Sequence, residues 1–143
     1  MRIMALDVGS KRIGVAVSDP MRIIVQPLEV IQRKSINDDL KKILELISVN
    51  EVSTLVVGVP YADNGGLSVQ AKKIISFKDK LAAFIRKNNI NSVVIELIDE
   101  TMTNHDAHES MKNAGIKHSK RRSVIDKMAA VMILEDYLRA NNQ

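Results

Sequence analysis

Three acidic residues lie far apart in the sequence, at positions where a carboxylate needs a functional or structural explanation. Asp7 interrupts the apolar stretch at residues 3–8. An unpaired buried carboxylate is costly, so Asp7 should meet a cation or lie at a strand end. Glu100 follows closely on the apolar run at residues 93–98, and Asp126 is expected to open the last helix. Because ligand sites gather at the carboxyl ends of strands in sheets with helical crossovers, Glu100 is placed where such a site is expected.

Basic residues accompany two of these acids in the sequence. Lys11 and Arg12 come shortly after Asp7, and Asp126 is embedded in a second basic segment. Lysine and arginine neutralise phosphates, and each such contact makes binding to a nucleic acid sensitive to salt. Acids that hold a metal, beside cations that hold a phosphate backbone, are what a phosphodiester-cleaving site needs. The second segment contains Lys117, His118, Lys120, Arg121, Arg122 and Lys127.

Each candidate also has a purely structural interpretation. Asp7 could turn the chain before a glycine, and basic side chains are often ordinary solvated charge. Asp126 lies three residues after Ser123, which is the spacing of a helix capping box. The same spacing follows Glu100, at Thr103 and Asp106. The sequence alone leaves both interpretations open for each acid.

The elements that must position these residues follow from hydrophobic periodicity. Two strands are predicted at 3–8 and 12–18, joined by a turn, and Pro27 should confine a third strand to a sheet edge or a bulge. Early meandering strands followed by strand–helix–strand crossovers predict an α/β domain with a mixed sheet flanked by helices, the layout of RNase H-like domains. The third strand is predicted at 23–31 and further strands at 55–60 and 93–98. Two helices are predicted from apolar faces that recur between 36 and 47 and between 74 and 85, and two more close the chain, the last at about 124–138.

Composition limits the class of protein. A chain of 143 residues is long enough for one domain, predicted to span residues 1–143, and too short for two ordinary ones. It has no cysteine, which excludes disulfides, thiolate zinc sites and cysteine nucleophiles. No apolar run approaches the roughly 20 residues of a membrane span, so we expect a cytoplasmic protein with no membrane partner. Aromatic residues make up 3% of the chain, too few for a base-stacking platform.

Three stretches of the sequence resemble the YqgF family of pre-16S rRNA nucleases, relatives of Holliday-junction resolvases. Residues 7–19 (DVGSKRIGVAVSD) are similar to the opening signature of that family. Residues 56–60 (VVGVP) resemble its fourth strand, and residues 125–138 resemble its closing helix. Order, spacing and length also agree, so the resemblance covers essentially the whole chain.

The resemblance implies an RNase H-like mixed five-stranded sheet and an endonuclease that processes the 5′ end of pre-16S rRNA in ribosome biogenesis. It implies that Asp7, Glu100 and Asp126 are the catalytic residues and the metal ligands. Such oxygen ligands suit Mg²⁺ or Mn²⁺. The implied partner is structured RNA or branched DNA, and the chain is expected to act as a monomer or homodimer. The phosphates of the nucleic acid would be positioned by Lys11, Arg12, Lys120, Arg121 and Arg122.

The sequence departs from the family pattern after Glu100, where the usual arginine is replaced by Thr101. The loop after Pro60 differs as well. Three alternatives therefore stay open: a Holliday-junction resolvase acting on four-way DNA junctions, a non-catalytic nucleic-acid-binding protein of the same fold, and a phosphate-binding hairpin like that of actin-like ATPases. The last would need a second lobe around the nucleotide.

Overall fold

The computed structural model describes residues 1–61, 66–90, 92–100 and 118–141. The elements of this described part are β1 Arg2–Val8, β2 Arg12–Ser18, β3 Val25–Gln32, α1 Ile36–Val49, β4 Val52–Val59, α2 Val69–Lys87, β5 Val94–Asp99 and α4 His118–Asn141. Within α4 the side chains of residues 118–124 and 126 are not described. The described part forms an α/β domain with one mixed sheet, ordered β3-β2-β1-β4-β5, so the predicted five-stranded sheet is confirmed.

Strand direction decides which ends of the strands meet. β1 is antiparallel to β2, whereas β1, β4 and β5 are mutually parallel neighbours. The carboxyl ends of these three strands therefore lie along one edge of the sheet, as expected for ligand sites in sheets with helical crossovers. β1 ends at Val8 and β5 ends at Asp99, so the acids at 7 and 100 reach the same edge.

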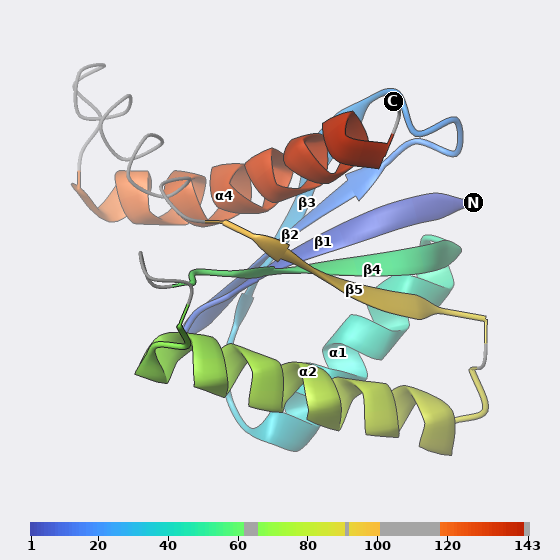
Figure 1. The fold of residues 1–143 in the computed structure, drawn as a ribbon, viewed down its shortest axis with the longest axis horizontal. Coiled ribbons are helices and arrows are strands. Elements are labelled where there is room, and N and C mark those ends of the chain that lie inside the picture. The colour runs from blue at the N-terminus through green and yellow to red at the C-terminus, as the bar shows by residue number, and fades with distance from the viewer. Residues whose placement is uncertain (62–65, 91, 101–117, 142–143) are drawn as a thin grey trace.

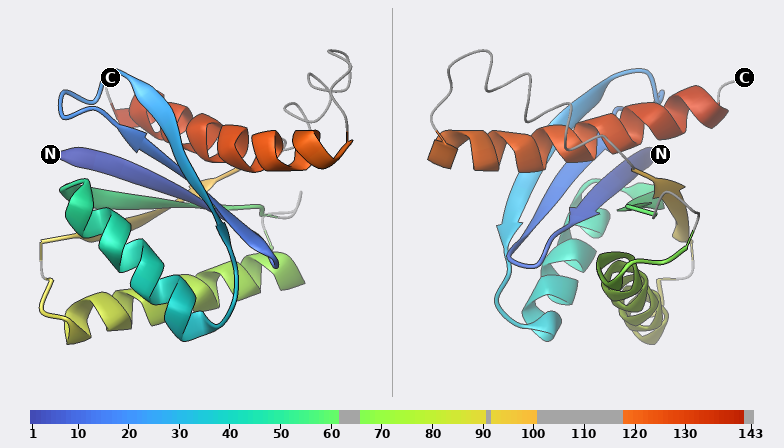
Figure 2. Two further views of the ribbon diagram at one scale, coloured as in Figure 1. Left: turned by 180° about the vertical axis from the view of Figure 1, so that it is seen from behind. Right: turned by 60° about the vertical axis from the view of Figure 1, so that its left-hand side comes forward.

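Helices cover both faces of the sheet. α1 and α2 lie on one face and α4 lies on the other (Figures 1 and 2). Because side chains alternate along a strand, β1 contributes to two separate cores. Met4 and Leu6 pack in the core beneath α1 and α2, whereas Ile3 and Ala5 pack beneath α4. The core beneath α4 includes three alanines, Ala5 of β1, Ala16 of β2 and Ala130 of α4.

The edge position of β3 confirms what Pro27 predicted. β3 is the outermost strand beside β2, and the pairing register shifts between Val15 and Ala16, opposite Pro27. Proline cannot donate a ladder hydrogen bond, so it is tolerated at such an edge and bulge. α2 begins at Val69, where the Ser68 side chain accepts a hydrogen bond from the Ala71 amide and caps the helix.

The last helix begins well before the predicted position 124, which corrects the sequence-based assignment of Asp126. α4 starts at His118, so Asp126 lies in the helix interior rather than opening it, and Ser123 cannot be its N-cap. Lysine and arginine are good helix formers, and they carry the helix back through the basic segment. The predicted helix before it falls within residues 101–117, outside the described residues. In the described part of the chain, no helix has the length and apolar character needed to cross a membrane.

Candidate functional site

Asp7 lies on the face of the sheet that α4 covers. Its side chain falls on the same side of β1 as Ala5, and it is 8% exposed. On one side its register partner is Gly14 of β2. On the other side Leu6 pairs with Val57, which brings Gly58 of β4 next to Asp7. The Asp7 carboxylate therefore stands between two strands that carry glycine beside it, in a hollow that larger side chains would fill.

Glu100 reaches the same hollow from the end of β5. Its backbone amide donates a hydrogen bond to the Val59 carbonyl at 3.1 Å, which fixes the chain as it leaves the strand. Its carboxyl group lies over Gly58, because a Cβ added to that glycine would stand 2.9 Å from Glu100 Oε2. The same Cβ would stand 2.5 Å from Ile133 Cδ1 of α4. Glu100 is thus enclosed between the sheet and α4, with 5% of its surface exposed.

The two carboxyl groups interact directly. Burial raises the pKa of Glu100 to about 9, helped by the negative charge of Asp7, by a hydrogen bond between the two side chains and by the charge of Asp99. Two carboxylates in one site repel each other, so one of them keeps a proton to higher pH. At neutral pH and without a cation, the pair therefore shares a proton that Glu100 carries.

This donor set fits a divalent cation. Glu100 Oε2 is buried and has no hydrogen-bond partner among the described residues. A buried oxygen without a partner is destabilising, and a cation between the carboxylates would satisfy it in place of the proton. Hard oxygen donors of this kind suit Mg²⁺ or Mn²⁺. Within the described residues no group of three or more potential metal ligands occurs, so Asp7 and Glu100 form a pair there.

The remaining predicted site residues are described only in part. Asp126 lies in α4, one turn before the buried residues Ala129 and Ala130, but its side chain is outside the described part. The side chains of residues 120–122 are outside it too, although their backbone forms the first turns of α4. Figures 1 and 2 show α4 passing close to the end of β5, with its first turns extending beyond that strand. The backbone of residues 118–122 therefore lies past the end of β5.

Near β1, the two predicted phosphate-binding residues lie at the hairpin turn that follows Asp7. Lys11 is exposed and Arg12 is half-buried. The Gly9 amide donates a hydrogen bond to the Arg12 carbonyl at 2.8 Å and closes the turn. Sequence reasoning overlooked Gly58, whose only signal was a glycine inside a strand, a sign of close approach by another group.

Gly58→Ala is expected to impair the site more than the fold. The new methyl group would overlap the ends of two side chains, Glu100 and Ile133, and both must shift. Overpacking of this kind costs roughly 1–3 kcal/mol, and part of that is offset because alanine loses less conformational entropy in a strand than glycine. We expect the free energy of unfolding to fall by about 1 kcal/mol while Mg²⁺ affinity falls at least about tenfold.

Chemical unfolding and calorimetric titration with Mg²⁺ measure these two effects on the same preparation. Gly66→Ala, at an exposed glycine before α2, is a control for a general effect of replacing glycine. Unchanged Mg²⁺ affinity in Gly58→Ala would contradict the placement of the cation beside Glu100.

Comparison with known proteins identifies the family. The model of the RuvX family, described as Holliday junction resolvase, matches residues 1–140. A protein of Clostridium acetobutylicum named "Putative pre-16S rRNA nuclease" is 39% identical over 140 residues, covering 98% of this chain and 99% of its own length. One of Desulforamulus reducens with the same name is 41% identical over 138 residues, covering 96% of both chains.

Solved structures agree with the fold. T. thermophilus RuvC in complex with Holliday junction substrate superposes with a TM-score of 0.60 at 16% identity, covering 99% of this chain and 96% of that one. The Fowlpox virus resolvase, in complex with Holliday junction DNA, gives 0.59 at 11% identity and covers 100% of both chains. At such identities the likeness shows the RNase H-like fold alone. The family match and the full-length relatives together show that the chain belongs to the RuvX family, which is also known as YqgF.

Proposed function

We propose that this protein is a divalent-metal-dependent endonuclease that cuts the precursor of 16S rRNA at its 5′ end. The buried carboxyl pair of Asp7 and Glu100 is the observation that carries this proposal. A protein gains nothing in stability from two buried acids that share one proton, so a chemical role accounts for them better than a structural one. The names of the full-length relatives support RNA as the substrate.

The residues of such a site have separate roles. Asp7 and Glu100 would hold the cation, and Gly14 and Gly58 leave the room that the carboxylates need. Burial beneath α4 strengthens the electrostatic attraction between the acids and a cation. When bound, the divalent ion supplies positive charge to the phosphate oxygens and makes water more acidic, which is what phosphodiester hydrolysis requires.

Asp126 is proposed as the third ligand. Residues spaced 126, 130 and 133 share one face of a helix, and Ala130 and Ile133 of that face are buried against the sheet. Ile133 also lies next to Gly58, the residue beneath Glu100. Because Asp126 lies in the interior of α4, N-terminal capping does not explain its presence. The basic residues Lys11, Arg12, Lys120, Arg121 and Arg122 would then hold the phosphates of the strand on either side of the acids.

The test offers the purified protein two substrates side by side, a precursor 16S rRNA fragment and a four-way DNA junction. Each is incubated with Mg²⁺, with Mn²⁺ or with a chelator. We expect a discrete cut in the RNA that depends on metal, and cleavage of the junction at least about tenfold slower, a difference of about 1.4 kcal/mol in activation free energy. Metal-independent binding of both substrates without cleavage would contradict the proposal and favour a non-catalytic binding protein.

A junction resolvase is the second candidate, because the family description names that activity and RuvC shares the fold. Cutting a symmetric junction in two opposite strands calls for a two-fold dimer. The same experiment decides between the two candidates. Paired, symmetric cuts in the junction that exceed the rate of RNA cleavage would favour the resolvase.

A further inference from the structure

A second candidate binding site lies on the face of the sheet opposite the acid pair. A cavity of about 910 Å³ opens between the β1–β2 turn, the segment that joins β3 to α1, and α2. Its walls come from three parts of the chain that are distant in sequence. The cavity belongs to the same side of the domain as the core beneath α1 and α2, to which Phe77 of its wall contributes.

The walls of this cavity are strongly basic. The β1–β2 turn contributes Lys11 and Arg12, and α2 contributes Lys72, Lys73 and Lys80. All four lysines are exposed. The third wall adds two further cations, at positions 33 and 34, and among the described residues the lining contains a single acidic residue. Seven cations against one carboxylate make a concave surface that concentrates anions.

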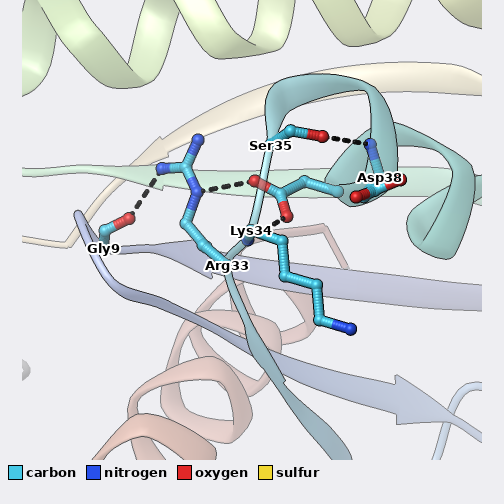
Figure 3. A network of polar contacts seen from close by, with 6 residues as sticks. Gly9, Arg33, Lys34, Ser35 and Asp38 are labelled. Atoms are coloured by element: carbon cyan, nitrogen blue, oxygen red, sulfur yellow. Dashed lines mark hydrogen bonds and ion pairs between the residues drawn. The ribbon is translucent and has the colours of Figure 1, made fainter.

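The acidic residue of the described lining, Asp39, already holds an arginine in place. Asp39 accepts a hydrogen bond from Arg33 Nε at 3.0 Å and another from the Lys34 amide at 3.1 Å. Arg33 Nη1 donates to the Gly9 carbonyl at 2.8 Å, and its guanidinium group lies over the Phe77 ring, 5.0 Å from the centroid. Figure 3 shows this arrangement around Arg33 and Gly9. A guanidinium group fixed in this way loses little entropy when it binds an anion.

Two helices add to the positive potential of the cavity. α1 begins after Ser35 and α2 begins after Ser68, and the first residue of each helix lines the cavity. The amino-terminal end of a helix carries a partial positive charge, which favours phosphate groups. The helix ends and the seven side chains therefore point to the same class of ligand, a polyanion.

We propose that this cavity binds the phosphate backbone of the nucleic acid at a second place, away from the acid pair. The inference rests on the proposed function and names how the same substrate is held. The open shape of the cavity and its spread of cations over three elements suit an extended backbone, whose phosphates contact several side chains at once. A single small anion would contact only a few of these cations.

The β1–β2 turn lies between the acid pair and the basic cavity. Asp7 and Lys11 are four residues apart, so their backbones are separated by at most about 14 Å. Along a duplex, that distance corresponds to roughly four base pairs. The Arg33 amide donates to the Lys11 carbonyl at 2.9 Å, so the turn is held against the cavity wall. A substrate that reaches the acid pair can therefore continue around the turn into the basic cavity.

The test removes three cations from the α2 wall. The triple variant Lys72→Gln, Lys73→Gln, Lys80→Gln is compared with Lys41→Gln, Arg86→Gln, Lys87→Gln, which loses the same charge at exposed positions outside this cavity. Binding to an RNA hairpin is measured in chelator across a series of salt concentrations. We expect the first variant to bind at least about tenfold more weakly at low salt, with its salt slope smaller by roughly 2, because each lost phosphate contact removes 0.7–0.9. The control should keep the wild-type slope.

Measurement in chelator separates this inference from the proposed function. If no cleavage is ever found but the slope still falls, the nuclease proposal fails and the binding site stands. Equal slopes in wild type and the first variant, or an equal loss in the control, would overturn the binding site. So would saturable binding of ATP or inorganic phosphate that the first variant abolishes while its RNA binding stays unchanged, since that result indicates a small-anion site.

Protection from acetylation gives a second measurement that needs no variant. The wild-type protein is treated with an acetylating reagent with and without the RNA hairpin, and modified lysines are identified by mass spectrometry. We expect RNA to protect Lys72, Lys73 and Lys80 and to leave Lys41 and Lys87 reactive. Equal reactivity of Lys72, Lys73 and Lys80 with and without RNA would contradict the proposal.

Discussion

Replacing Asp7 with asparagine is expected to lower metal-dependent cleavage by at least about a thousandfold, which corresponds to about 4 kcal/mol of transition-state stabilisation. Asparagine keeps the shape of the side chain but loses the charge that would hold the cation. The fold should survive, because Asp7 is a buried acid whose negative charge raises the pKa of Glu100 and so does not stabilise the fold. Initial rates on the precursor RNA with Mg²⁺, together with chemical unfolding of both proteins, measure the two expectations.

Asp79→Asn is a matched control for this variant. Asp79 is an exposed aspartate of α2 that pairs with Lys78 at 2.7 Å, so it loses the same charge away from the acid pair. An exposed ion pair contributes at most about 1 kcal/mol, and we expect no change in cleavage rate. If the Asp7 variant cuts at the parental rate in preparations free of contaminating nuclease, Asp7 has no role in the reaction.

The acid pair could be predicted because Asp7 interrupts one apolar run and Glu100 closely follows another. Strand periodicity placed Asp7 inside β1 and Glu100 just after β5, and parallel neighbours bring such ends together. The structure confirms that these two meet. Gly58 makes room for Glu100 because of the register between β4 and β5 and because the Ile133 side chain of α4 lies close to Gly58. Local periodicity in the sequence predicts neither the register nor this contact.

Other features depended on contacts that only the folded chain shows. The start of α4 was misplaced because Ser123 and Asp126 have the spacing of a capping box, whereas the basic residues before them continue the helix. The basic cavity combines residues near positions 11, 33 and 73, whose proximity no sequence pattern predicts. The spacing of Lys73 and Lys80 on one helical face was a signal, although it is also typical of an ordinary solvated face.

Glu100→Gln is expected to make the metal-free protein more stable above about pH 5 and to abolish its stabilisation by metal. In the folded protein the pKa of Glu100 is about 9, against 4.5 for an unperturbed glutamate. Between these values the folded state binds more protons than the unfolded state, so stability falls as pH rises. Glutamine imitates the protonated acid, can still donate to Asp7 and cannot ionise. At pH 8 the variant should gain on the order of 2–4 kcal/mol.

Mg²⁺ should offset most of this difference in stability. A cation that binds only the folded protein adds about 2.7 kcal/mol at a hundred times its dissociation constant. The wild-type protein should gain this amount, whereas the variant keeps only one charged member of the pair and should gain little. Urea unfolding across the pH range, in chelator and in Mg²⁺, measures both effects, with Glu45→Gln at an exposed position of α1 as the control. Parallel pH curves for Glu100→Gln and the wild-type protein in chelator would show that Glu100 does not carry the shared proton. If the acid pair destabilises the fold in chelator and stabilises it in Mg²⁺, cation binding and not stability explains why both acids are buried there. The two unfolding series test both parts of that statement.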